Sequence, residues 1–244
     1  MVHEGETALP EPGHGFATTN WSLVLLAHAN DDGGAALNRL CRRYWTPTYV
    51  YIRRTGLAPA DAEDATQDFF AYILERSWLK QTGEERGSFR GYLLALLRHF
   101  LANRRRVAGA QKRGGLQAFG PAELVEIEQI ATKEADPSVA YERTWAGCIT
   151  QSALEQLERE QTQAGSTKRF VALRGYLTLP LTPAESDRIA AELDEPRNRL
   201  SVYLHRLKRR YGELIRAEVL DTVSDPKEVD AELRRLVEVL SPAA

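Results

Sequence analysis

Apolar residues recur at helical spacing along much of the chain, and the clearest run follows Ser88. Its members repeat at i, i+3, i+4 and i+7 without a gap and are Phe89, Tyr92, Leu93, Leu96, Leu97, Phe100 and Leu101. This spacing predicts an amphipathic helix with Ser88 as its N-cap. Strand-like alternation of apolar and polar residues occurs only within stretches that also have helical spacing, so we predict an all-α fold.

Shorter runs of the same spacing predict helices before this one. They are a helix over 21–29, a helix from Leu37 that Pro47 interrupts and that resumes over 49–54, and a helix capped by Asp61. Gly56 is expected to end the second of these helices. The acidic residues that follow Asp61 suit the positive end of a helix dipole.

The C-terminal half of the sequence predicts a helix-turn-helix motif. Thr182 is a favourable N-cap, and Pro183 suits the first position of a short helix. A tight turn follows, in which Asp194 tolerates a left-handed backbone. The second helix then carries an apolar face of Leu200, Leu204, Leu207, Tyr211, Leu214 and Ile215. The same spacing also fits an ordinary helical hairpin with a basic outer face.

These patterns predict two small helical domains joined by a linker, with a further C-terminal helix. Residues 1–17 are rich in Gly, Pro and Glu and predict a disordered tail, and residues 18–108 form the first domain. Residues 109–138 are the linker, with a short helix around 122–130, and residues 139–220 are the second domain. Residues 221–244 are the extension, whose amphipathic helix starts at Asp225.

The net charge of −2 conceals three segments of opposite sign. The segment between Arg54 and Arg76 has five acids and no base, whereas 86–122 has eight bases and no acid, and 196–212 has six bases and no acid. Each basic segment lies at one end of a predicted helix, which favours contacts with nucleic-acid phosphates over a merely solvated face.

The sequence offers little for other chemistry. The five histidines are scattered, the two cysteines have no CxxC partner, and no phosphate-binding glycine motif occurs, so we predict no metal, no cofactor and no catalytic residue. Asp64 and Asp68 would share a helix face, which leaves a metal-dependent nuclease as an unfavoured alternative. No apolar run reaches the length of a membrane span, and the cysteine content fits a reducing cytoplasm.

Several stretches resemble a known family: bacterial RNA polymerase sigma factors of the extracytoplasmic-function type, in a branch with a short C-terminal extension. The matching stretches are Leu40–Arg54, Asp61–Phe70, Glu85–Leu94, His99–Asn103, His205–Tyr211 and Leu214–Val219. The resemblance covers about residues 18–240 and implies a non-enzymatic factor that binds core polymerase and directs promoter-specific initiation. The turn departs from the family pattern, because Asp194-Glu195 stands where glycine and an apolar residue are usual.

The resemblance also implies three groups of binding residues. The polymerase-binding group, which faces the β′ clamp, is Asp61, Asp64, Gln67 and Asp68. The group that binds the minus-ten promoter element is Arg90, Arg98, His99, Asn103, Arg104 and Arg105. The group that binds the minus-thirty-five element is Arg197, Arg199, Ser201, His205, Arg206 and Arg209.

The implied partners are core RNA polymerase, through its β′ clamp and β flap, and promoter DNA, with no membrane partner. The sequence leaves open whether an anti-sigma protein, phosphorylation or the last helix controls the factor. The main alternative is a stand-alone helix-turn-helix regulator, which would bind duplex DNA without polymerase, typically as a symmetric dimer. That alternative assigns no role to the acidic segment or to the first basic segment.

Overall fold

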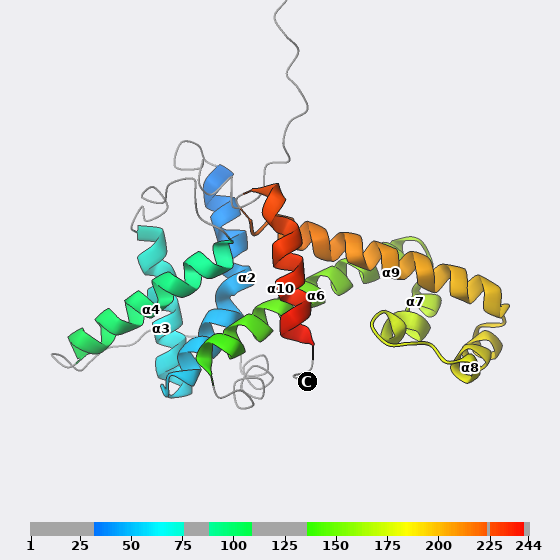
Figure 1. Cartoon of the computed structure of the whole chain (residues 1–244), viewed down its shortest axis with the longest axis horizontal. Helices are drawn as coiled ribbons and strands as arrows, with labels where there is room; N and C mark the ends of the chain where they lie inside the picture. The colour runs from blue at the N-terminus through cyan, green and yellow to red at the C-terminus, as the bar shows by residue number, and fades with distance from the viewer. Residues whose placement is uncertain (1–31, 76–87, 109–135, 224, 242–244) are drawn as a thin grey trace, which may run out of the picture.

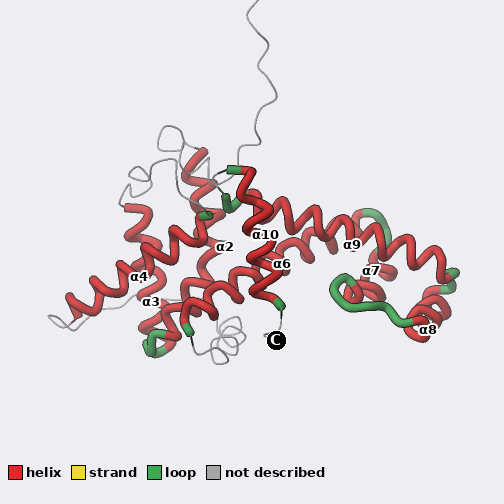
Figure 2. The backbone as a smooth tube through the Cα atoms, viewed as in Figure 1, coloured by secondary structure: helices red, strands yellow, loops and turns green. Residues whose placement is uncertain are grey.

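The computed structural model describes residues 32–75, 88–108, 136–223 and 225–241, which form helices joined by short loops (Figures 1 and 2). These ranges contain no β-strand, only an isolated bridge between Ser88 and Val223, so the all-α prediction is confirmed. The predicted tail over 1–17, the helices over 21–29 and 122–130, and linker residues 109–135 lie outside the described residues.

The first described helix, α2 (Asp32–Arg54), runs unbroken through Pro47, so the predicted interruption is wrong. Proline removes one backbone hydrogen bond, but Tyr44, Thr48 and Tyr49 around it are at most 1% exposed. Burial of this helix against its neighbours therefore outweighs the local cost. Gly56, with φ of 94°, ends the segment as expected.

The next helix, α3 (Pro59–Glu75), begins before Asp61, which lies in its first turn. The prediction that Asp61 is the N-cap is therefore wrong. Pro59 explains the earlier start, because its fixed φ suits the first helical position. The predicted apolar face is confirmed, since Ala62, Ala65 and Phe69 are fully buried.

The basic helix α4 (Phe89–Ala108) starts where predicted. The Ser88 hydroxyl accepts a hydrogen bond from the Gly91 amide at 3.4 Å, which confirms Ser88 as its cap. The Phe89 amide donates to the Thr222 carbonyl at 3.0 Å, so the start of α4 is tied to a segment more than a hundred residues later. Leu93 and Leu97 bury the predicted apolar face.

Two long helices, α6 (Pro137–Gln163) and α9 (Arg197–Leu220), lie side by side and connect two hydrophobic cores (Figure 1). In α6, the first core takes residues up to Ile149 and the second core takes residues from Ala153. In α9, Leu214 belongs to the second core and Val219 to the first. The boundary between the cores therefore falls within both helices, whereas the sequence predicted the second domain to begin at residue 139.

The second core is completed by three short elements, α7 (Thr167–Leu173), η2 (Arg174–Tyr176) and α8 (Pro183–Leu193). Phe170 and Leu173 of α7 and Ile189 of α8 are at most 1% exposed and share the second core with the buried leucines of α9. These contacts fix the orientation of the N-terminal half of α9.

The C-terminal extension consists of η3 (Pro226–Glu228) and α10 (Val229–Leu240). The Asp225 side chain accepts from the Lys227 amide at 2.9 Å, as expected for the start of this segment. Val229 and Leu236 are buried in the first core, so α10 packs where α6 and α9 meet that core (Figure 1).

Candidate nucleic-acid interface

A capped short helix, α8, is followed by a tight turn and then by the longer helix α9. Thr182 and Glu185 make a reciprocal capping box at the start of α8, with the Thr182 amide 2.9 Å from the Glu185 carboxylate. The hydrogen bond from the Thr182 hydroxyl, followed by that from its amide, lowers the pKa of Glu185. Asp194 ends α8 with φ of 51° and ψ of 47°, which confirms its left-handed conformation.

The turn after Asp194 is held by polar contacts rather than by an apolar side chain. The Glu195 amide donates to the Ala190 carbonyl at 3.0 Å, and the Glu195 carboxylate accepts from Arg169 of α7 at 2.5 Å. Arg169 also lies over the ring of Tyr203, 5.9 Å from its centroid. This network links α7, the turn and α9.

Helix α9 buries Leu200, Leu204 and Leu207 and turns its other face to solvent. Among the residues predicted to bind the minus-thirty-five element, Arg199, His205 and Arg206 are exposed and make no ion pair within the described residues. Unpaired cations on an exposed helix face are available to phosphates and base edges without first breaking an internal contact.

The remaining predicted residues of α9 are also exposed but have partners. Arg197 pairs with Asp187 of α8 at 3.1 Å, and Arg209 pairs with Glu213 one turn later at 3.4 Å. The Ser201 hydroxyl donates to the Arg197 carbonyl at 3.0 Å. Such exposed pairs are weak, so a phosphate can compete for either arginine.

Three exposed residues of α9 lie outside the predicted binding group: Asn198, Val202 and Lys208. Asn198 and Val202 lie one turn apart opposite the buried leucines, and Val202 is 53% exposed. An amide can bind adenine edges and an apolar side chain can contact the thymine methyl group. A count of helical positions opposite Leu200 and Leu204 places Asn198 and Val202 on this face.

The predicted polymerase-binding and minus-ten groups meet at one ion pair. Asp68 of α3, whose side chain is 60% exposed, pairs with Arg104 of α4, whose side chain is 34% exposed. Of the other acidic-segment residues, Asp61 is exposed, while Asp64 and Gln67 are half-buried. The acidic face of α3 and the basic end of α4 are therefore neighbouring surfaces.

The other α4 residues predicted to bind DNA lie towards its basic end. Arg98, His99 and Arg105 are exposed, and the Asn103 amide lies 3.2 Å from the His99 ring. The Arg98 guanidinium donates to the Ser138 hydroxyl of α6 at 2.8 Å. These side chains form a polar, cationic surface about two to four turns from Arg90.

Arg90 differs from the rest of its predicted group because its side chain is only 11% exposed. It donates to Glu142 of α6 at 2.7 Å and, through two nitrogens, to Glu232 of α10 at 3.1 Å each. Burial disfavours the charged guanidinium and lowers its pKa. The hydrogen bond to Glu232 and the negative charges of Glu232 and Glu142 outweigh this effect, so the pKa of Arg90 is raised. In this arrangement Arg90 is not available to DNA.

Other site types find little support in the described part of the chain. There, no group of three or more His, Cys, Asp or Glu side chains is arranged to hold a metal ion. The described helices also include none that is both long and apolar enough to span a bilayer. Comparison with family models, with curated proteins and with solved structures gave no match to this chain.

Proposed function

We propose that this protein is a sigma-type transcription initiation factor that binds core RNA polymerase and directs it to a promoter. The observation that carries the proposal is the exposed face of α9, where Arg199, His205 and Arg206 have no ion-pair partner among the residues that the structure describes. This face follows a left-handed turn and a capped short helix, as in helix-turn-helix proteins. In that motif the N-terminal part of the second helix reads base edges in the major groove.

The separation of the two basic surfaces supports contacts with two promoter elements. The α4 surface lies beside the start of α6, and the N-terminal half of α9 lies near its far end, where Tyr203 donates to Gln161 at 2.9 Å (Figure 1). Because α6 has 27 residues, it spans about 40 Å. One short DNA half-site cannot cover both surfaces, whereas two separate elements can.

The acidic face of α3 supports a protein partner of opposite charge. Asp61 and Asp68 are exposed there, next to the cationic end of α4. Duplex DNA would be repelled by these carboxylates, while a basic helical surface on polymerase would be attracted. This arrangement favours a polymerase-bound factor over a stand-alone regulator, which has no use for the acidic face.

The test is promoter-specific run-off transcription with purified core polymerase and the full chain. We expect the protein to co-purify with core polymerase and to direct initiation on a template selected by that holoenzyme from genomic fragments. Arg206→Ala should weaken binding to the upstream duplex by about 1–3 kcal/mol if Arg206 contacts a base edge. The matched control is Arg188→Ala on α8, which removes an equally exposed arginine that pairs with Glu192 away from the α9 face.

The outcomes separate the alternatives. Failure to bind core polymerase, combined with tight binding to duplex DNA by the protein alone, would establish a stand-alone regulator. Equal losses for Arg206→Ala and Arg188→Ala would show that α9 is not the reading surface. Magnesium-dependent cleavage that is lost in Asp64→Ala but kept in Arg206→Ala would support the nuclease alternative.

A further inference from the structure

The C-terminal helix α10 is joined to α4 and α6 by a partly buried network of charges. Arg90 of α4 is its centre: Nε and Nη2 donate to the two carboxylate oxygens of Glu232, and Nη1 donates to Glu142. The side chains of Arg90, Glu142 and Glu232 are 11%, 15% and 12% exposed. The guanidinium also lies over the Trp145 ring, 5.0 Å from its centroid.

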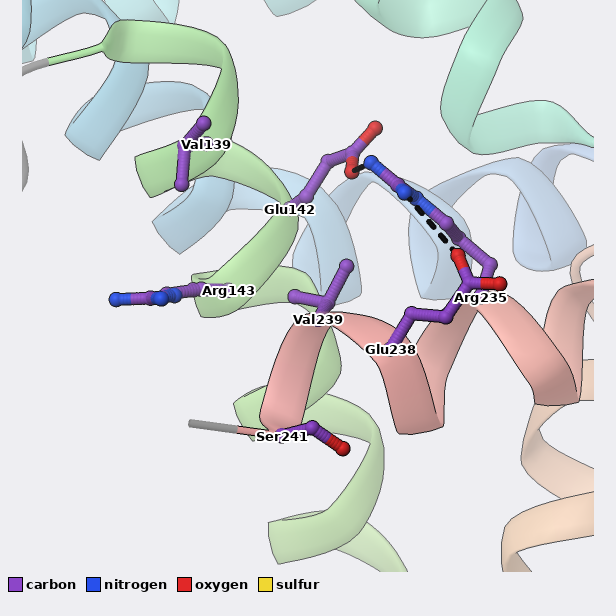
Figure 3. Close-up of a pocket in the computed structure, with 7 residues that line it drawn as sticks. All are labelled: Val139, Glu142, Arg143, Arg235, Glu238, Val239 and Ser241. Atoms are coloured by element: carbon purple, nitrogen blue, oxygen red, sulfur yellow. Dashed lines mark hydrogen bonds and ion pairs between the residues drawn. The ribbon is translucent and has the colours of Figure 1, made fainter. Parts of the chain in front are cut away.

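A second arginine closes the network on the solvent side. Arg235 of α10 donates to the other oxygen of Glu142 and to Glu238 one turn later (Figure 3). Glu142 therefore bridges an arginine of α4 and an arginine of α10. The three helices meet here beside a small pocket that Val139, Arg143 and Ser241 also line (Figure 3).

The attachment of α10 combines these polar contacts with a narrow apolar face. Val229 and Leu236 are buried and Leu233 and Val239 pack half-buried against the first core, while Val237 and Leu240 are 62% and 47% exposed. A helix of 12 residues is marginal by itself in water, so its order relies on what it packs against. Elements with few buried apolar contacts are the ones that open locally.

The position of Arg90 gives the network a functional meaning. Arg90 lies on the same helix as the exposed Arg98 and Arg105, two turns or more from them. All three nitrogens of its guanidinium already donate to the carboxylates of Glu142 and Glu232. A carboxylate and a phosphate compete for the same guanidinium donors, because both accept two parallel N–H hydrogen bonds from arginine. While Glu232 is bound, Arg90 cannot engage a phosphate.

We propose that α10 is an intramolecular latch: Glu232 occupies Arg90, and α10 must detach before α4 can engage promoter DNA fully. This inference rests on the proposed function for its consequence in transcription. The latch itself is a property of the free protein. It makes DNA engagement by α4 compete with the internal α4–α10 contact.

The first experiment measures open-complex formation by the holoenzyme with full-length Glu232→Gln, on the template selected by the wild-type holoenzyme. Permanganate reactivity of unpaired thymines reports the opened strand. Loss of the bidentate charged contact should accelerate opening about tenfold. The matched control is Asp230→Asn, also on α10, whose carboxylate pairs with Arg216 and not with Arg90; it should open at the wild-type rate.

A second variant keeps the test valid if Glu232→Gln folds poorly. Arg90→Lys preserves the positive charge but cannot donate in two parallel directions, so it weakens the latch without removing the cation. It should also accelerate opening. Unchanged or slower opening in both variants, with folding verified by circular dichroism, would overturn the latch and leave Arg90 with a purely structural role.

The second experiment follows α10 directly by amide hydrogen exchange. In the free protein, amide exchange in residues 229–240 should be faster for Glu232→Gln than for Asp230→Asn. For the wild-type protein, exchange in the same residues should be faster in the open complex than in the free protein. Equal α10 protection in the free protein and in an open complex that does form would reject the latch and keep the proposed function. Absence of any open complex, with faster α10 exchange in Glu232→Gln, would reject the proposed function and keep the latch.

Discussion

Asp194 is the one described residue other than glycine with positive φ, and its substitution tests how the turn positions α9. A left-handed backbone costs an ordinary L-residue roughly 1–2 kcal/mol, and Asp reduces this cost because its short polar side chain hydrogen-bonds locally. We therefore expect Asp194→Ala to destabilise the protein by about 1 kcal/mol. Asp194→Gly should lie within about 0.5 kcal/mol of wild type, because relief of strain offsets the larger entropy of the unfolded chain.

The assay is thermal unfolding followed by circular dichroism, together with binding of the selected upstream duplex. For a chain of 244 residues, 1 kcal/mol corresponds to a shift in Tm of about 2–4 °C. Glu192→Ala is the control, because this exposed residue of α8 has helical backbone and only a surface pair with Arg188. The reasoning is refuted if Asp194→Ala is as stable as wild type, or if Asp194→Gly loses as much stability as Asp194→Ala.

Three further predictions concern the surfaces and the core. Val202→Ser should abolish any thymine preference at the base pair that Val202 contacts. The measurement replaces each thymine of the selected duplex with deoxyuridine, which lacks only the methyl group. An equal loss of duplex affinity on this replacement in wild type and in Val202→Ser would contradict the role. Arg104→Ala should impair strand opening, measured by permanganate reactivity, more than upstream duplex binding, measured by footprinting. Arg206→Ala should show the opposite order. Identical effects of the two variants on both steps would reject two separate surfaces. Burial raises the pKa of the Cys148 thiol from 9.0 to about 11, so at pH 8 its thiolate fraction is about 100-fold lower, and peptide mapping after alkylation should show slow labelling that rises with pH up to that value. Labelling of Cys148 as fast in native as in denatured protein would show that the thiol is not buried.

Local signals in the sequence were enough to place most helix starts. Ser88 and Thr182 cap the helices that they were predicted to cap, and Asp194 adopts the left-handed conformation expected of it. These predictions succeeded because capping and turn geometry depend on residues within one turn of each other. The errors at Pro47 and Asp61 arose where burial, or a proline at an earlier position, outweighed the local preference.

The candidate surfaces were only partly predictable for the same reason. Helical periodicity predicts which face of α9 is exposed, whereas the binding residues on that face were implied by the family resemblance. The resemblance also grouped Arg90 with Arg98 and Arg104, which lie on the same predicted helix. Its carboxylate partners lie 52 and 142 residues away in the sequence, and no local pattern reports contacts at that separation.

The sequence by itself determined the all-α class, the capped start of α8 with the left-handed residue at its end, and the separation of acidic from basic segments. These features follow from periodicity, capping and charge, which act over short stretches of chain. Only the tertiary structure decided that α6 and α9 each take part in both cores, that Asp68 pairs with Arg104, and that α10 closes over Arg90. Each of these depends on which helix faces share a core, because packing brings together residues that are far apart along the chain. Around Arg90 the charges are partly buried and therefore require partners.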